Sequence, residues 1–228
     1  MFFAPADLEV IVLSVKVAAV ATFLSLPVGF LVAAGLGMSR FPGRALVDGV
    51  INLPLVLPPV VVGYFLLILL GDNGFFGPIL KALGIKIVFN WKGAVVASAV
   101  VGFPLLVRSI RLGIESIDEG MFHAARSLGA TWRDILFSVV LPQSWRAILV
   151  GATLMFARSL GEFGATVMIA GSIPGRTQTI PLAIFDYTNQ PGKDANALKL
   201  CIVSMALSFS VLLVSEYLAR RAKKTVTR

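Results

Sequence analysis

Long apolar runs alternate with short polar segments along this chain. Uncharged runs cover residues 17–39, 49–71, 93–107, 163–175 and 200–215. A helix needs roughly 20 apolar residues to cross the hydrocarbon core of a bilayer, and the first two runs reach that length alone. The third and the last reach it if the charged tips of Lys92, Arg108 and Lys199 extend toward the interface.

The fourth run is short and becomes a span only by joining residues 147–157, with Arg158 and Glu162 inside it. We therefore predict about five membrane helices, near residues 9–38, 46–71, 91–110, 145–171 and 198–219. The composition agrees, with 57% hydrophobic residues, 14% charged residues and a mean hydropathy of +0.88. Such values are typical of helical membrane proteins. We expect an all-α integral membrane protein, with residues 1–228 forming a single transmembrane domain.

Positive charges concentrate in alternate loops. The net charge of +8 alone would suit nucleic acid, but this distribution instead fits membrane topology, so we expect no nucleic-acid partner. The positive-inside rule places the N-terminus outside and the C-terminus in the cytoplasm, and the basic tail is also suited to anionic lipid. The residues expected on the inner side are Arg40, Arg44, Arg108, Arg111, Arg126, Arg133, Arg146, Arg220, Arg221, Lys223, Lys224 and Arg228. The opposite loops contain Lys81, Lys86, Arg176 and Lys193.

Several other classes of protein are disfavoured. The first residues lack a basic region and the first apolar run is too long for a cleaved signal peptide. One cysteine, Cys201, and one histidine, His123, exclude an intramolecular disulfide and disfavour a metal site. The chain has no G-x-x-x-x-G-K-[ST], G-x-S-x-G or H-E-x-x-H motif. We therefore expect no metal, no cofactor, no catalytic residue and no ATP hydrolysis by this chain.

A polar island covers residues 112–144, on the side predicted to be cytoplasmic. Ser116 and Glu119 have the spacing of a capping box that opens a helix, and Ile117, Met121, Ala125 and Leu128 follow on one face. Gly129 suits the left-handed residue that ends such a helix. Thr131 and Asp134 have the spacing to cap a second helix, which should stop near Pro142. The pattern fits a helical hairpin that either docks a cytoplasmic protein or lies on the membrane.

Two charged residues are expected inside the fourth span. Arg158 follows Arg146 by twelve residues, which is about 18 Å along a helix and past the middle of the bilayer. Arg158 and Glu162 are four residues apart, so they share a face and can pair. Ala157, Gly161 and Ala165 form an adjacent stripe of small residues, which favours close helix contact. This face either lines a transport path or gate, or holds a buried structural ion pair.

Prolines interrupt the second span and the last external loop. Pro54, Pro58, Pro59 and Gly63 predict a kinked helix, which either faces a pore or is bent for structural reasons only. The loop at residues 172–197 contains Pro174, Pro181 and Pro191 around the short apolar segment 182–185. It should lie outside, where it either docks a partner or simply connects two spans.

The island resembles the signature loop of ABC-importer permeases, E-A-A-x(3)-G-x(9)-I-x-L-P. Every spacing is kept, with His123 in place of the family glutamate and Val139 in place of isoleucine. Ala124, Ala125, Gly129, Leu141 and Pro142 match the signature. More specifically, the chain is similar to molybdate permeases of the sulfate/molybdate group in the stretches FPG (41–43), LPLVLPPVVVGY (53–64), FARSLGEFGAT (156–166) and IPGRTQTIP (173–181).

The resemblance implies a type I ABC importer permease in a bacterial or archaeal cell (inner) membrane. It implies a homodimer that works with two cytoplasmic ABC ATPase subunits and an external oxyanion-binding protein. The island would then be the ATPase-coupling loop, with His123, Ala124, Ala125, Gly129, Leu141 and Pro142 as its signature positions. His123 is either a surface residue or a hydrogen-bonding contact to the ATPase. We take Pro58, Pro59, Arg158, Gly161 and Glu162 as candidate pore or gate residues.

The expected function is inward transport of an oxyanion, which the resemblance indicates to be molybdate, driven by ATP hydrolysis on the partner subunits. A sulfate or tungstate permease of the same group is the first alternative, because these oxyanions share charge and shape. A noncatalytic membrane anchor and an ion-coupled secondary transporter are the others. The charged pair and the broken second span count against an anchor, and the chain has no internal repeat of the kind found in secondary transporters. Five helices are few for a polar path, and a symmetric dimer would supply ten.

Overall fold

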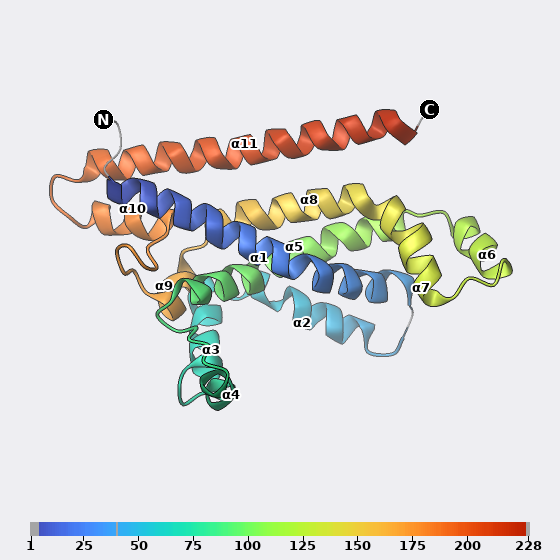
Figure 1. Cartoon of the computed structure of the whole chain (residues 1–228), viewed down its shortest axis with the longest axis horizontal. Helices are drawn as coiled ribbons and strands as arrows, with labels where there is room; N and C mark the ends of the chain where they lie inside the picture. Colours follow the sequence, from blue (N-terminus) through green and yellow to red (C-terminus); the bar gives the residue numbers. More distant parts are fainter. Residues whose placement is uncertain (1–4, 40, 227–228) are drawn as a thin grey trace.

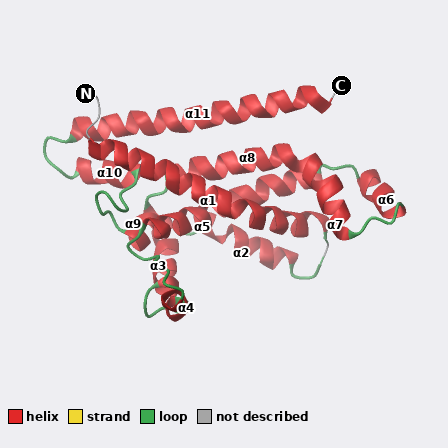
Figure 2. Ribbon diagram, viewed as in Figure 1, coloured by secondary structure: helices red, strands yellow, loops and turns green. Residues whose placement is uncertain are grey.

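The computed structural model describes residues 5–39 and 41–226, and the regular structure of this part is helical throughout (Figures 1 and 2). The elements in chain order are α1 (Pro5–Met38), α2 (Arg44–Val56), α3 (Pro59–Leu70), α4 (Gly77–Ala82), α5 (Trp91–Glu115), α6 (Glu119–Ser127), α7 (Trp132–Ile135), a π-helical segment (Leu136–Val140), α8 (Leu141–Leu160), α9 (Gly164–Ala170), α10 (Ile180–Thr188) and α11 (Asp194–Val226). The all-α prediction is confirmed.

The described helices include four that are long and apolar enough to cross a membrane, or up to five if the bent pair α2 and α3 counts as one span. The prediction of about five membrane helices is therefore confirmed. The side chains of the predicted basic tail, Arg220 to Arg228, lie outside the described part of the structure, as does Arg40.

Helices α1, α5 and α8 form the core. Small residues let them approach closely, as is usual between membrane helices. A Cβ atom added at Gly29 of α1 would lie 2.7 Å from Leu106 Cδ2 of α5, and one at Gly113 of α5 would lie 2.2 Å from Ala147 Cβ of α8. Leu106 and Ile110 are fully buried at this junction. The glycines therefore set the separation of the three helices.

The second predicted span is broken, which confirms and sharpens the predicted kink. Helices α2 and α3 meet at an angle of 112°. Leu57 and Pro58 both have extended backbones, with ψ angles of 143° and 132°, because a residue that precedes proline is forced out of the helical region. Pro54 lies inside α2 and does not end it. In Figure 1, α3 and α4 leave the bundle as an arm.

The fourth predicted span has different ends from those expected. The second helix of the island does not stop at Pro142; the chain stays helical from Trp132 to Leu160. Proline lacks an N–H and its ring crowds the carbonyl four residues earlier. The π-helical turn just before Pro142, in which Leu141 N–H donates to Leu136 C=O, loosens the helix at this point. The span also ends at Leu160 instead of residue 171, because the chain breaks before α9.

The predicted external loop contains a helix of its own. Helix α10 lies beside the start of α1, where Tyr187 Oη donates to Asp7 Oδ1 at 2.9 Å and Ser14 Oγ accepts from Ile180 N at 2.7 Å. Burial, together with the hydrogen bond to Asp7, raises the pKa of Tyr187. In Figure 1, α9, α10 and the start of α1 lie at one end of the molecule, and α6 and α7 lie at the other.

Candidate functional site

The island begins with a tight turn after α5. Asp118 caps α6, since its Oδ1 accepts from Gly120 N at 2.7 Å. The capping box predicted at Ser116 and Glu119 is wrong: Ser116 ends α5, and its Oγ donates to Gly113 C=O at 2.7 Å. The hydroxyl is used within α5, so the next side-chain acceptor, Asp118, starts the new helix two residues later.

Gly129 ends α6 with the left-handed backbone predicted for it, at φ +79°. Ala130 N–H donates to Ala125 C=O, and Gly129 N–H donates to Arg126 C=O. These two bonds form a Schellman motif, which reverses the chain after a helix. No heavy atom lies within 4 Å of a Cβ added at Gly129, so backbone conformation, and not space, favours glycine here.

Thr131 and Asp134 form the predicted capping box of α7. Asp134 N donates to Thr131 Oγ1 at 3.3 Å, and Thr131 N donates to Asp134 Oδ2 at 2.8 Å. The side-chain hydrogen bond from Thr131, followed by its backbone bond, lowers the pKa of the exposed Asp134 carboxyl. The Schellman motif and the capping box therefore fix both sides of a single turn.

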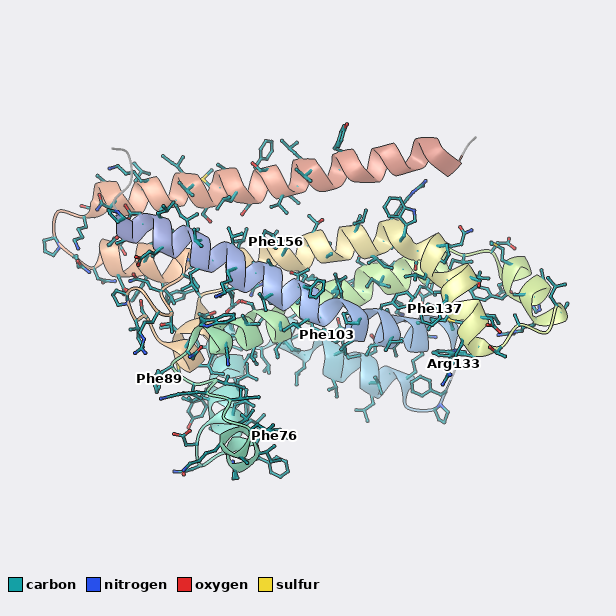
Figure 3. The ribbon with its side chains drawn as sticks, in the orientation of Figure 1. Phe76, Phe89, Phe103, Arg133, Phe137 and Phe156 are labelled. Atoms are coloured by element: carbon teal, nitrogen blue, oxygen red, sulfur yellow. The ribbon has the colours of Figure 1, made fainter. Side chains whose placement is uncertain are left out.

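Apolar side chains are exposed around this turn. Leu128 is 88% exposed, Phe137 is 63% exposed and Trp132 is 53% exposed, and Figure 3 shows Arg133 and Phe137 at the same end of the molecule. The apolar face predicted for α6 is partly wrong, because Ala125 packs against the core whereas Leu128 points away from it. Exposed leucine and aromatic side chains gathered at one end of the molecule are suited to contact with another protein or with lipid.

The signature positions lie in different environments. Ala124 is exposed on α6, and Leu141 and Pro142 are exposed at the start of α8. His123 is exposed and lines a hollow of about 420 Å³ between α6 and the ends of α1 and α5. The structure thus places these residues along the island from α6 to the first turn of α8.

The charged pair predicted in the fourth span is present at the break between α8 and α9. Arg158 Nη1 lies 2.6 Å from Glu162 Oε2, in an ion pair without the directed geometry of a hydrogen bond. The other carboxylate oxygen, Oε1, accepts from Ala165 N in the first turn of α9 at 2.8 Å. The Glu162 side chain is 1% exposed and that of Arg158 is 31% exposed. Glu162 therefore holds the break, and Arg158 extends from it.

The two breaks are brought together by a close crossing of α3 and α9. A Cβ added at Gly63 would lie 2.6 Å from Ala165 C=O, and one added at Gly164 would lie 2.9 Å from Pro59 Cβ. Pro58 and Pro59, at the start of α3, are thus near the start of α9, where Glu162 Oε1 accepts from Ala165 N. Gly161 is exposed at the end of α8. The candidate gate residues from two separate spans therefore gather at one place.

Sequence reasoning missed two features of this region. The sequence did not show that Gly164 contacts α3, because the residue it meets, Pro59, is distant in the chain. A charge cluster of Arg44, Asp48, Arg111 and Glu115 joins α2 to α5, and its members are up to 71 residues apart in sequence. The four-residue spacings of Arg44 and Asp48 and of Arg111 and Glu115 were the available signals.

Comparison with known proteins gives full-length relatives. The chain is 47% identical to the Molybdenum transport system permease protein ModB of Escherichia coli (strain K12), covering 100% of both chains. It is 48% identical to the protein of that name from Haemophilus influenzae, covering 96% of both. The Sulfate transport system permease protein CysT of Salmonella typhimurium is 38% identical, with 85% of this chain and 71% of the relative covered.

Solved structures share the fold at low sequence identity. An inward-facing structure of the MetNI methionine ABC transporter matches with a TM-score of 0.72 at 18% identity, covering 96% of this chain and 99% of the other. A bacterial ABC transporter that imports alginate matches with a TM-score of 0.76 at 17% identity, covering 96% and 81%.

The fold, the helical island and the sequence relatives all indicate the same protein family. Residues 25–224 match the family model described as "Binding-protein-dependent transport system inner membrane component". The chain is therefore a multi-pass membrane protein that belongs to the family of binding-protein-dependent transport system inner membrane components.

Proposed function

We propose that this chain is the permease subunit of an ABC importer that carries molybdate into the cell. The observation that carries the proposal is the 47% identity over the whole chain to a molybdenum transport permease. In this proposal two copies of the chain form the membrane path, two cytoplasmic ATPase subunits supply the energy, and an external binding protein delivers the oxyanion. An alginate importer of the same fold has been solved with its periplasmic protein bound, which supports a partner of that kind.

The island at residues 112–144 is the proposed ATPase-coupling loop. The small, exposed side chain of Ala124 allows a close approach of the α6 backbone to a groove on the ATPase, while Ala125 packs α6 against the core. The exposed Leu128 supplies apolar contact area, and the Schellman turn at Gly129 fixes the angle of the loop. Because α7 continues through the π-helical turn into α8, displacement of the island is passed to a membrane helix.

The proposed gate lies where α3 crosses α9. Pro58 and Pro59 break one span, and Gly161 and Glu162 stand at the break in the other. Backbone groups freed by a break at membrane depth require protein or water as a partner. The two breaks with their charged pair therefore suit a place where a polar path opens and closes.

The ion pair favours a weak transport site. Glu162 offsets the charge of Arg158, so the gate attracts a dianion less than a free arginine would. A transport site must release its substrate as well as bind it, and an external binding protein supplies the tight binding instead. This division of labour also explains why the permease needs no high-affinity oxyanion site of its own.

The orientation follows from the charges. The end of the molecule with α6, α7 and the start of α2 holds Arg44, Arg126 and Arg133 and is proposed to face the cytoplasm. The end with α9, α10 and the start of α1 is proposed to face the outside and meet the binding protein. The N-terminus is then external and the C-terminus cytoplasmic.

Sulfate and tungstate are the second candidate substrates. Sulfate transport permeases are 37–38% identical to this chain over four-fifths or more of its length, and the three oxyanions share charge and shape. A membrane anchor is less suited, because an anchor has no use for a broken span or for a buried carboxylate such as Glu162.

ATP hydrolysis in proteoliposomes tests the proposal. The vesicles contain this chain, an ABC ATPase from the same organism and a binding protein loaded in turn with molybdate, tungstate or sulfate. We expect stimulation by the molybdate-loaded protein. Stimulation by sulfate alone would overturn the substrate, and no stimulation in an assembled complex would overturn the importer.

A matched pair of variants tests the loop. Gly129→Val places a β-branched side chain at φ +79°, which that backbone disfavours, and should abolish the stimulation. Gly84→Val imposes the same strain at φ +67°, also with no heavy atom within 4 Å, but lies between α4 and α5. It should leave the stimulation intact.

A further inference from the structure

A charge cluster of four residues joins the inner half of the broken span to the helix that leads into α6. Arg111 Nε lies 2.8 Å from Glu115 Oε1, and Arg111 Nη1 lies 2.9 Å from Asp48 Oδ2. Arg44 Nη2 lies 2.8 Å from the same Glu115 oxygen. One carboxylate of α5 is thus shared by two arginines, and one arginine bridges two carboxylates.

These contacts fix α2 to α5 at one end. None of the residues of α2 is buried. Apolar packing alone therefore holds this helix only weakly against α5. Arg44 and Asp48 occupy its first two turns, and both pair with the last turn of α5. The cluster therefore sets the register between the two helices.

The same cluster adjoins the island. Glu115 is the last residue of α5, and α6 starts at Glu119 after a short turn that hydrogen bonds hold at Ser116 and Asp118. Arg44 and Glu115 also line the hollow beside α6, together with His123 and Arg126. A displacement of α6 relative to the bundle therefore acts first on this cluster.

The far end of α2 is the break at the proposed gate. Helix α2 has 13 residues, so it extends about 20 Å from the cluster to Leu57. A continuous helix of this length transmits a tilt at one end as a displacement at the other. The α2–α3 junction then moves against α9 at the close crossing.

We infer that Asp48, Arg111, Glu115 and Arg44 are positioning residues that couple displacement of α6 to the break between α2 and α3. This inference rests on the proposed function. The side chains of the cluster are 22–38% exposed, and partly solvated ion pairs exchange at small cost. The cluster can therefore re-pair during a transport cycle, which a fully buried pair would resist.

Oxyanion uptake per ATP hydrolysed tests the inference in the reconstituted complex. Asp48→Asn keeps the shape of the side chain but removes the charge that holds Arg111. We expect uptake per ATP to fall about fivefold to tenfold, at the lower end of typical couplings between sites, while stimulated ATP hydrolysis stays near the wild-type rate. Arg44→Gln, which removes the other tie, should change the ratio in the same direction and serves if Asp48→Asn fails to assemble.

Two controls separate coupling from a general structural effect. Arg108→Gln removes a charge that lines the same hollow as Asp48 and Arg111, and Arg108 has no ion pair in the described structure; it should leave the ratio unchanged. Asp48→Glu retains the carboxylate and should restore much of the ratio. The double variant Asp48→Asn/Arg111→Gln should lose no more than the more severe of its two single variants, as members of one unit do.

The outcomes are distinguishable from failure of the proposed function. A wild-type complex without stimulated hydrolysis or uptake would overturn the importer itself. A working wild type in which Asp48→Asn and Arg44→Gln keep the normal ratio would overturn the inference alone. The inference also fails if hydrolysis and uptake fall in the same proportion, or if Arg108→Gln has an equal effect.

Discussion

Single glycines decide how closely the two broken spans approach. A Cβ at position 63 would lie 2.6 Å from Ala165 C=O and 2.7 Å from Ala165 Cα. Both are backbone atoms, so no side-chain rotation relieves the contact, and α3 must move away from α9. Gly63 is therefore required for packing, although its own backbone is an ordinary helix.

We expect Gly63→Ala to lower the free energy of unfolding by about 1–3 kcal/mol, the usual cost of overpacking. Thermal unfolding of the purified chain in detergent measures the effect. Gly35→Ala in α1 is the matched control, because no atom lies within 4 Å of a Cβ added there. An unchanged unfolding midpoint for Gly63→Ala would show that the crossing is looser than described.

The Glu162 carboxylate has two roles that one substitution separates. Glu162→Gln keeps an oxygen that accepts from Ala165 N, so the break should persist, but it leaves Arg158 without its negative partner. We expect normal membrane insertion and dimer assembly with oxyanion uptake reduced several-fold, because a free arginine retains the dianion. Uptake in reconstituted vesicles and assembly by size-exclusion chromatography are measured on the same preparation. Failure to insert would instead identify a structural ion pair.

At the scale of the element, local chemistry was readable from the sequence. The prolines indicated a kink in the second span without placing it at Pro58, glycine indicated the turn at Gly129, and spacing identified both the Thr131–Asp134 cap and the Arg158–Glu162 pair. Each of these depends on residues within four positions of one another. The sequence also contained enough apolar runs to indicate about five spans, and the signature spacing indicated the family.

The predictions failed where the local structure depends on a residue distant in the chain or on a feature without a clear sequence pattern. Pro142 did not end its helix, because a π-helical turn precedes it, and π turns have no clear sequence signal. Asp118, and not Ser116, caps α6, because the Ser116 hydroxyl donates a hydrogen bond to a carbonyl of α5. The contact of Gly63 with Ala165 and the pairing of Asp48 with Arg111 join residues far apart in the chain, which no local pattern reveals.

The exposed leucine of the island leads to a prediction for this element. Leu128 is 88% exposed, so Leu128→Gln costs the isolated permease little stability. If the side chain is buried against the ATPase, the substitution should weaken their association about tenfold, as loss of a well-packed apolar contact does at an interface. Co-purification or titration of the ATPase measures this. Leu83→Gln, at a side chain 66% exposed beyond α4, should bind like wild type; equal binding by both variants would contradict docking through Leu128.

At the scale of the whole molecule, the two ends differ in charge and in structure. One end carries the island and Arg44 at the start of α2, and the other carries α10 with its hydrogen bonds to α1. Because positive residues stay on the cytoplasmic side, these ends should lie on opposite sides of the membrane. A molecule with both ends on one side would leave neither a path across the bilayer nor separate docking surfaces for ATPase and binding protein.

Thiol labelling of intact cells tests this orientation. In a Cys201→Ser background, Asn189→Cys introduces a thiol just after α10 and Ser127→Cys introduces one at the end of α6; both positions are exposed. A membrane-impermeant maleimide should label the first in intact cells and the second only after permeabilisation. The reverse pattern would invert the molecule and place the island outside, on the same side as the external binding protein, where a cytoplasmic ATPase could not reach it. The orientation therefore decides whether the island can couple ATP hydrolysis to the gate at all.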